Sequence, residues 1–405
     1  MSTIHSHTTA GFGWRPTTPV SADALQVAGH ELTVFVEAEP LAVRLLADLR
    51  WAQKRIWIES YIFAADEMGR TLAQVLKAKA RQGLDVRVMY DAVGCLTTPD
   101  EFFEDLAAAG VRVHGFHQAS EALRRWAFLR VFNRRNHRKL VVIDDSVAYF
   151  GGMNLVDPLG DAALEEARSE RLPEARGWRD VHVRLVGPQQ AAIAAMMDYL
   201  WRKVDHERVR QPRWALRQML SCRQDGLFVF DCQPGFRGRR AARVLCPLLR
   251  RARHTITISM AYFLPTGSVL RELLQAARRG VRIRVLIPGN SDVPLAHWAC
   301  RHNYHRLLKA GIRIFERRER MLHSKVLVID DQWSIVGSCN LDPRSLRSNL
   351  EFLCVLRSRE FAGLLTNIAA IEMRHSHKVV EHHWRSRSRW RRLLDAWAWK
   401  MRKWL

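Results

Sequence analysis

The sequence lacks the long apolar runs of a membrane-spanning protein. No stretch of 18 uninterrupted apolar residues occurs, so we expect no segment to span a bilayer. The N-terminus, residues 1–19, has no basic segment followed by an apolar core, so we expect no signal peptide. These absences predict a protein that is soluble or bound to a surface.

Cysteine is scarce and its spacing is irregular. The seven cysteines are odd in number, are scattered along the chain and include no C-x2-C pair. Disulfide frameworks and structural zinc sites need paired or closely spaced cysteines. The histidines at 375, 377, 382 and 383 also have no partners at metal-ligand spacing. We therefore expect reduced thiols, a cytosolic setting and no metal.

Acidic residues are too few to balance the basic ones. The 405 residues include 64 Lys and Arg against 41 Asp and Glu, which gives a net charge of +23. Such an excess attracts polyanions, either nucleic acid or an anionic lipid surface, and does not choose between them. The length is enough for two domain-sized cores.

What the sequence does contain is one short pattern in two copies. Both copies read H-x-K-x4-D-x6-G-x2-N, with every spacing identical. The first consists of His137, Lys139, Asp144, Gly151 and Asn154, and the second of His323, Lys325, Asp330, Gly337 and Asn340. A pattern of this length that occurs twice is the strongest signal in the chain.

The residue types of the pattern suit phosphoryl chemistry. Each copy leads into an apolar, β-branched run, 140–143 or 326–329, which predicts a buried strand. His and Lys two positions apart on a strand point to the same face. Asn154 and Asn340 follow the next apolar segment, as if a paired strand brought them back to bind phosphate oxygens. Each copy thus offers an imidazole, a fixed cation and an amide donor.

Two copies supply the two faces that displacement at phosphorus needs. One neutral imidazole can attack in line while the other, protonated, protonates the leaving oxygen. Histidines can hold opposite protonation states near neutral pH, and the pair should titrate as one coupled unit. Two lysines already neutralise the phosphate, so we expect no cofactor.

Asp144 and Asp330 complete the pattern and enter the candidate catalytic set with it. Both stand before turn-like stretches, where Asp is common for local backbone reasons. We expect their role to be mainly structural.

The duplication extends upstream of the two patterns. In each half a helical periodicity stops near a glycine, Gly83 or Gly280, and an apolar strand follows. The order strand, helix, strand, helix, strand and pattern is that of an α/β lobe. We expect an α/β fold with two pseudo-symmetric lobes, each a mixed β-sheet flanked by helices. Because both histidines are needed in one site, that site should lie at the lobe interface.

The expected boundaries follow from the repeat. They are an N-terminal extension (1–28), a first lobe (29–200), a charged linker (201–226), a second lobe (227–374) and a tail (375–405). An insert at about 119–135 precedes the first pattern. It is expected to be either a solvated basic loop or a lipid contact beside the site.

The C-terminal tail is basic and rich in tryptophan. Residues 384–405 carry eight Lys or Arg, one Asp and five Trp. A helical wheel places on one face Trp390, Leu393, Leu394, Trp397, Met401 and Trp404, whereas Trp399 falls off it. This arrangement predicts an in-plane membrane helix with its cations on anionic lipid. The alternatives are a helix docked on the protein and a nucleic-acid-binding tail.

The two patterns resemble those of the phospholipase D superfamily. The resemblance covers roughly residues 30 to 370 and is closest to the bacterial cardiolipin synthases, of the short peripheral type. Besides the two patterns it rests on Asn136-His-Arg-Lys139, Gly151-Gly-Met-Asn154, Gly337-Ser-Cys-Asn340-Leu-Asp-Pro343 and Ser348-Asn-Leu-Glu351. It implies that both lobes are phospholipase D-like.

The resemblance also implies a mechanism. The reaction would be ping-pong through a covalent phosphatidyl-histidine, with His137 as nucleophile and His323 as general acid and later base. The symmetry of the sequence permits the reverse order. An acidic residue downstream of each pattern is expected to orient the histidine: Glu351 in the second half and Asp180 in the first.

The leading hypothesis is a phosphatidyltransferase that makes cardiolipin. It would transfer from phosphatidylglycerol to a second lipid alcohol, release glycerol, and lie peripherally on the cytoplasmic face of a bacterial cell membrane. A phospholipase D hydrolase, or a transferase to another alcohol, would use the same residues. A phosphodiesterase on nucleic acid suits the charge, but superfamily nucleases are short, single-motif chains and the tail favours lipid. Intact residues in both halves argue against a non-catalytic binding protein.

Overall fold

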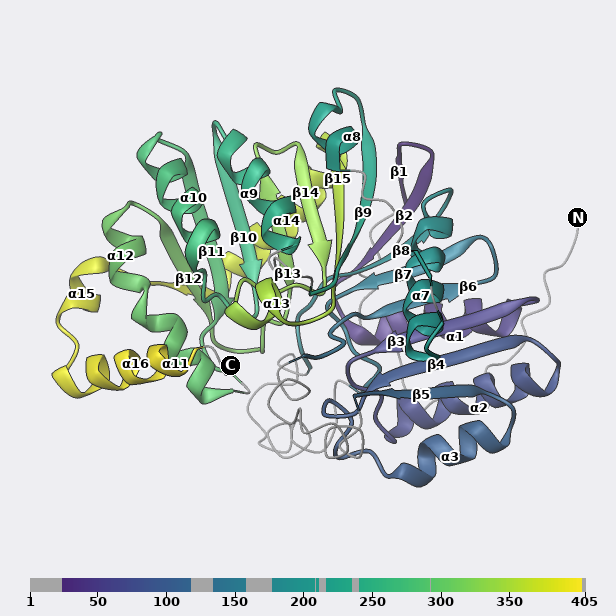
Figure 1. Cartoon of the computed structure of the whole chain (residues 1–405). Coiled ribbons are helices and arrows are strands. Elements are labelled where there is room, and N and C mark those ends of the chain that lie inside the picture. Colours follow the sequence, from purple (N-terminus) through teal and green to yellow (C-terminus); the bar gives the residue numbers. More distant parts are fainter. Residues whose placement is uncertain are drawn as a thin grey trace, which may run out of the picture.

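Two mixed β-sheets, one in each lobe, form the framework of the computed structural model (Figure 1). The structure describes residues 24–117, 134–157, 177–207, 209–210, 216–234, 240–291 and 293–402. The first sheet has the strand order β1-β2-β8-β7-β6-β3-β4-β5. Its strands are β1 (Leu25–Val27), β2 (His30–Phe35), β3 (Arg55–Ser60), β4 (Asp85–Asp91), β5 (Arg112–Phe116), β6 (Leu140–Ile143), β7 (Val147–Gly151) and β8 (His182–Val186).

The second sheet repeats the order of the first. From its far edge it reads β9-β15-β14-β13-β10-β11-β12-β16, so β13 takes the place of β6 and β15 that of β8. In both sheets three parallel strands adjoin antiparallel ones. Its strands are β9 (Gly226–Cys232), β10 (Thr255–Met260), β11 (Arg282–Pro288), β12 (Arg313–Arg317), β13 (Lys325–Ile329), β14 (Trp333–Gly337), β15 (Glu351–Arg357) and β16 (Ser376–Lys378). The expected pair of pseudo-symmetric α/β lobes with mixed sheets is confirmed.

Helices flank both sheets. In the first lobe they are α1 (Ala38–Trp51), α2 (Glu67–Arg81), α3 (Asp100–Ala108) and α7 (Gln190–Val204). In the second they are α8 (Leu216–Ser221), α9 (Arg240–Arg251), α10 (Gly267–Arg278), α11 (Pro294–His302), α12 (Tyr304–Lys309), α13 (Pro343–Arg347), α14 (Arg359–Arg374), α15 (Glu381–Arg385) and α16 (Arg389–Met401). Among the described residues, none of the helices has the length and apolar character needed to cross a membrane.

The strands that carry the two patterns are buried on both faces. On β6, Val141 packs in the cluster that includes α1 and α2, whereas Val142 belongs to a cluster that also contains Val328 of β13. One face of each sheet therefore packs on helices of its own lobe, and the other packs towards the opposite lobe. This explains why both runs are continuously apolar rather than alternating.

The lobe boundaries differ from the expected ones in detail. Strand β1 begins at Leu25, so the first sheet starts inside the expected extension 1–28. The expected linker is partly helical, because α7 continues to Val204 and α8 lies within it. Most of the insert at 119–135 lies outside the described residues.

Asp144 and Asp330 close turns at the ends of β6 and β13 that lie away from the histidines. Both have a left-handed backbone, with φ of 51° and 54°. The carboxylate of Asp144 accepts hydrogen bonds from the backbone N–H groups of residues 53–55, and that of Asp330 from those of residues 253–255, at 2.7–3.2 Å. Their place in the candidate catalytic set is therefore corrected: their carboxylates hold neighbouring strands in register, as the structural role requires.

Replacing Asp330 with alanine should lower the free energy of unfolding by about 2 kcal/mol, because three backbone N–H groups lose a charged acceptor. Asparagine tolerates the left-handed backbone and keeps an acceptor oxygen, so Asp330→Asn should cost less. Urea unfolding followed by circular dichroism measures both changes. Equal stability of the two variants and the parent chain would contradict this role.

Candidate active site

Backbone hydrogen bonds that cross the lobe interface bring the two patterns together. The N–H of His137, in the first lobe, donates to the carbonyl of Leu350, in the second, at 3.0 Å. The N–H of His323, in the second lobe, donates to the carbonyl of Arg179, in the first, at 2.7 Å. Leu350 and Arg179 directly precede the two candidate carboxylates. Each histidine is therefore fixed beside an acid of the other lobe.

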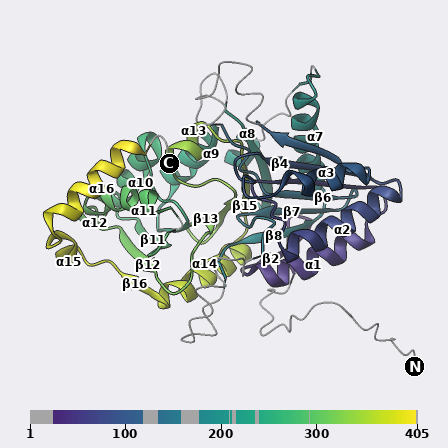
Figure 2. The same ribbon diagram turned by 90° about the horizontal axis from the view of Figure 1, so that it is seen from below.

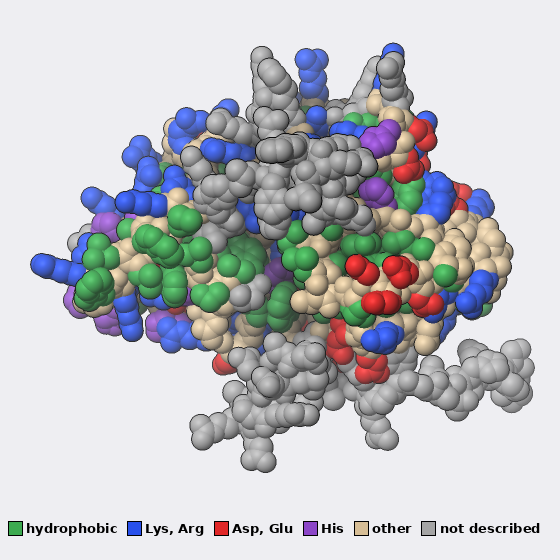
Figure 3. Space-filling view, turned by 60° about the horizontal axis from the view of Figure 1, so that its bottom comes forward, with side chains coloured by type: hydrophobic (Ala, Val, Ile, Leu, Met, Phe, Trp, Pro, Cys, Tyr) green, Lys and Arg blue, Asp and Glu red, His purple; other side chains and the backbone are tan. Residues whose placement is uncertain are grey.

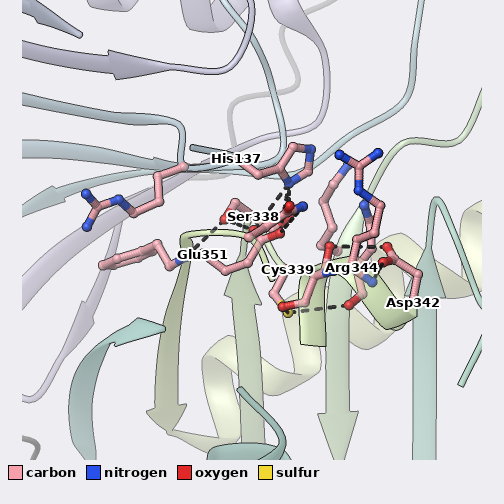
Figure 4. A network of polar contacts seen from close by, with 12 residues as sticks. His137, Ser338, Cys339, Asp342, Arg344 and Glu351 are labelled. Atoms are coloured by element: carbon pink, nitrogen blue, oxygen red, sulfur yellow. Dashed lines mark hydrogen bonds and ion pairs between the residues drawn. The ribbon is translucent and has the colours of Figure 1, made fainter. Parts of the chain in front are cut away.

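The histidine–carboxylate pairs are crossed. The Nδ1 atom of His137 lies 3.2 Å from the Glu351 carboxylate, and Nδ1 of His323 lies 2.7 Å from Asp180 (Figure 4 shows the first pair). The expectation that each acid serves the histidine of its own half is wrong. Glu351 opens β15 and Asp180 lies just before β8, and both chain segments meet the opposite lobe at the interface.

The contacts of His137 determine its tautomer. Its Nδ1 lies 3.0 Å from the carbonyl oxygen of Ser338. A carbonyl can only accept, so Nδ1 carries the hydrogen and the neutral ring has its lone pair on Nε2. The hydroxyl of Ser338 donates to Glu351 in turn. Ser338 therefore contacts both His137 and Glu351. The duplicated pattern did not predict a functional residue at this position.

Each lysine bonds back to the histidine of its own pattern. The Nζ atom of Lys139 lies 2.9 Å from the carbonyl of His137 and 5.1 Å from the centre of the Tyr61 ring. Lys325 donates to the carbonyl of His323, and its Nζ lies 3.0 Å from Nε2 of that ring. Burial, together with the charge of Lys325, holds the pKa of Lys139 well below its usual value. Two buried lysine amines so close together form a site for an anion, because a bound anion offsets the burial and the mutual repulsion that disfavour their charged forms.

Both imidazoles are neutral at neutral pH in the absence of substrate. Burial and the charge of Lys139 hold the pKa of His137 well below its usual value. Burial and the charge of Lys325 lower the pKa of His323, although Asp180 opposes them. The expected pair of opposite protonation states therefore needs an added negative charge, which a bound phosphodiester brings.

The two acids are held in different states. Burial raises the pKa of Glu351 to about 7. Burial alone would also raise the pKa of Asp180, but Lys325 and the hydrogen bond from His323 outweigh it and lower that pKa. Asp180 is thus ionised beside His323, whereas Glu351 takes up a proton much more readily beside His137. An imidazolium is favoured at His323 more than at His137.

The site opens into a cavity of about 290 Å³ between the lobes. Both histidines and both pattern asparagines line it. Tyr61 contacts the His137 ring edge-on at 5.1 Å, and Trp178 lies 5.0 Å from the ring of His323. Tyr61 and Tyr262 are equivalent in the repeat, which is the signal that could have placed them here. The other lining residues are Ile62, Arg135, Leu264, Val293, Ala296, Asp342, Arg344, Ser345 and Asn349.

Both pattern asparagines line this cavity. The side-chain oxygen of Asn154 accepts the N–H of Ile62 at 3.4 Å, which leaves the amide NH₂ group as donor. Asn340 is buried on the opposite lobe and lines the same cavity. Of the expected site residues, the structure therefore gathers the two histidines, lysines, asparagines and crossed acids, and excludes the two pattern aspartates. Within the described residues no cluster of candidate metal ligands occurs.

A family model described as the phospholipase D-like domain of cardiolipin synthase matches residues 45–160 and 245–370. The chain belongs to this family. It is 33% identical over 338 residues to cardiolipin synthase B of Escherichia coli K12, covering 82% of this chain and 78% of that one. It is 28% identical over 365 residues to a cardiolipin synthase of Halalkalibacterium halodurans, covering 90% and 70%.

Solved structures share the fold. The phosphatidylserine synthase of Haemophilus influenzae Rd KW20 superposes with a TM-score of 0.65 at 15% identity, covering 93% of this chain and 94% of that one. The polyphosphate kinase of Porphyromonas gingivalis gives a TM-score of 0.56 at 16% identity, covering 89% and 51%. At these identities the likeness concerns the two-lobed fold alone.

The lowered pKa of His137 can be measured by acylation with diethyl pyrocarbonate, which reacts with neutral imidazole only. The rate at His137 should stay at its plateau to a lower pH than that of N-acetylhistidine, with its half-point below 6.5. Mass spectrometry of the peptide that contains His137 gives the rate. Added phosphate should move the half-point upwards. A half-point equal to that of N-acetylhistidine would contradict the burial of the ring beside two cations.

Proposed function

We propose that this protein is a cardiolipin synthase. It transfers a phosphatidyl group from phosphatidylglycerol to the alcohol of a second lipid and releases glycerol. The observation that carries the proposal is one cavity with two histidines, each paired with a carboxylate of the opposite lobe and flanked by a buried lysine. The similarity to cardiolipin synthases over most of the chain supports the same substrate class.

In the first step His137 is the nucleophile. Its Nδ1–H is held by Ser338 and Glu351, and its Nε2 lone pair attacks the phosphorus atom. A phosphorus–nitrogen bond forms and the bond to the glycerol oxygen breaks. His323, protonated beside ionised Asp180, donates its proton to that oxygen, and glycerol leaves.

In the second step the roles of His323 reverse. Neutral His323 removes the proton of the acceptor hydroxyl, whose oxygen attacks the phosphorus atom. The phosphorus–nitrogen bond breaks, cardiolipin forms, and His137 regains its neutral state. The ammonium groups of Lys139 and Lys325 and the amides of Asn154 and Asn340 stabilise the charge on the non-bridging oxygens in both steps.

Two features favour this order of the histidines over the reverse. Among the described residues no hydrogen bond occupies Nε2 of His137, whereas the ammonium of Lys325 lies over the edge of the His323 ring, 2.8 Å from Nδ1 and 3.0 Å from Nε2. Asp180, whose pKa is lowered, also stabilises an imidazolium at His323 better than Glu351, whose pKa is raised, does at His137.

A donor lipid with a good leaving group distinguishes the catalytic roles of the two histidines. Phosphatidyl-p-nitrophenol needs no proton donor, so His323→Ala should release about one p-nitrophenol per enzyme in a burst and then stop. His137→Ala should give no burst. Stopped-flow absorbance measures both, and the exchange of the two results would assign the nucleophile to His323.

With phosphatidylglycerol vesicles, the parent chain should form cardiolipin and glycerol in equal amounts, measured by mass spectrometry. Each single alanine variant should lose about a thousandfold in rate or more, because the two histidines act as one unit. His382→Ala, exposed in α15, is the matched control and should keep its rate. Phosphatidic acid as the only product would make the protein a hydrolase, and no lipid turnover would refute the proposal.

The membrane is reached through α16. Ala398 is fully buried in the second lobe, and the ring of Trp399 stacks on His302 of α11 at 5.2 Å. The opposite face is exposed, with Trp390 at 82% and Trp397 at 53% exposure. One side of the helix thus packs on the protein, and the expected apolar side is exposed. Trp399 lies off the apolar face of the wheel because it belongs to the side that packs on the protein. Trp404 lies outside the described residues.

Helix α16 is linked to the active-site cavity through α11. Helix α16 packs along α11, and Ala296 of α11 and the preceding Val293 line that cavity. Figure 2 shows α16 on the outside of the second lobe, and Figure 3 shows hydrophobic side chains from this end of the lobe to the hollow between the lobes. Exposed Arg391, Arg392 and Lys400 complement anionic headgroups. This arrangement supports a peripheral enzyme whose cavity opens beside the lipid surface. We place it on the cytoplasmic side of the membrane as part of the same proposal.

Replacing both Trp390 and Trp397 with alanine should weaken binding to phosphatidylglycerol vesicles about tenfold or more, because their rings no longer insert at the headgroup level. Trp51→Ala is the matched control, since Trp51 is 79% exposed on α1 of the other lobe. Co-sedimentation at low and high salt measures the insertion as the salt-resistant part. Unchanged sedimentation of the double variant would remove α16 from the contact.

A further inference from the structure

Two arginines line the cavity in addition to the groups that serve the reacting phosphate. Arg135 lies two positions before His137 and is 2% exposed. Arg344 lies in α13, and Figure 4 shows it in the network that includes His137. Both line the same cavity as the histidines. The mechanism proposed above uses neither.

Both arginines line the cavity together with Tyr61, and their charges act on one another and on the Tyr61 hydroxyl. Burial lowers the pKa of Arg135, Asp91 and Tyr61 oppose this change, and the charge of Arg344 adds to it. Burial raises the pKa of the Tyr61 hydroxyl, and the charges of both arginines oppose this rise. Tyr61 in turn contacts the ring of His137. The arginines therefore form a second centre of positive charge beside the reacting centre.

The nearby carboxylates are bound to backbone groups. Asp91 lies 3.6 Å from Arg135, but it also accepts the N–H groups of Val93, Gly94 and Asn136 at 2.9–3.1 Å. Asp342 is the N-cap of α13 and accepts two N–H groups at 2.8 Å. These two carboxylates offset part of the positive charge of the arginines. Arg135 is buried and Arg344 is half-buried, so an anion bound between the two guanidinium groups would stabilise both charges.

The chemistry of the reaction supplies such an anion. The donor phosphate already has Lys139, Lys325, Asn154 and Asn340. Transfer between two phospholipids brings a second phosphodiester into the cavity, since three carbon atoms separate the attacking hydroxyl of phosphatidylglycerol from its own phosphate. Guanidinium groups bind phosphate oxygens in pairs with defined geometry. Hydrolysis, by contrast, brings only one phosphate.

We infer that Arg135 and Arg344 form a second phosphodiester subsite, which binds the phosphate of the acceptor phospholipid and directs its hydroxyl to the phosphatidyl-histidine. The inference rests on the proposed function and extends it to the acceptor. It gives a physical reason for transfer to a lipid in preference to water, because the subsite raises the effective concentration of the lipid hydroxyl at the phosphorus atom.

Two soluble acceptors, one without and one with a phosphodiester, test the contribution of this subsite independently of the reacting centre. With phosphatidylglycerol as donor in mixed micelles, labelled glycerol exchanges into the donor and carries no phosphate. Glycerophosphoglycerol, the deacylated headgroup, forms a half-deacylated cardiolipin and carries one phosphodiester. Arg344→Gln should raise the KM for glycerophosphoglycerol about tenfold or more, the usual loss for a charge-assisted contact, and leave glycerol exchange within about twofold. Mass spectrometry follows both products.

The controls lie on the same helix. Arg347 is exposed on α13, so Arg347→Gln should leave both reactions unchanged. Arg344→Lys keeps the charge and should recover part of the loss. Equal losses with both acceptors would place Arg344 at the donor and overturn the inference, as would an unchanged KM for glycerophosphoglycerol. Absence of both reactions in the parent chain would instead overturn the proposed function.

Discussion

The crossing of chain segments at the lobe interface is the constraint on which the site depends. Each histidine donates its backbone N–H to the residue that precedes an acid of the other lobe. Neither lobe alone contains a complete histidine–acid pair. The apolar faces that pack between the sheets, with Phe150 and Phe352 5.2 Å apart, hold the lobes at the separation these bonds require. Packing energy and catalytic geometry are thus coupled.

The site is built to be completed by an anion. Two lysines and two histidines are buried together, and burial penalises each charged form. In the free site, burial and the charge of the neighbouring lysine keep each imidazole neutral. A phosphodiester reverses this balance and allows one histidine to hold a proton. Protonation of the general acid is therefore coupled to substrate binding.

The two halves of the site are similar in structure but differ in charge, and this difference would give the two histidines different roles. The duplicated sheets place equivalent histidines, lysines and asparagines around one centre, and symmetry alone would leave their roles interchangeable. The acids differ, because Glu351 has a pKa of about 7 whereas that of Asp180 is lowered. The cavity lining also includes Arg135, Arg344 and Trp178. In the proposed transfer between similar lipids, such differences would distinguish donor from acceptor.

Local sequence determined the parts of this protein. The duplicated pattern, the doubly buried strands and the helix periodicity predict two α/β lobes and name the histidines, lysines and asparagines, because strand alternation and burial are local properties. The amphipathic tail helix follows from its wheel for the same reason. Only the tertiary structure decided that Glu351 serves His137, that Trp399 faces the lobe, and that Arg344 enters the cavity. These are contacts between segments distant in sequence, whose register is set by the packing of the two lobes and not by any local pattern.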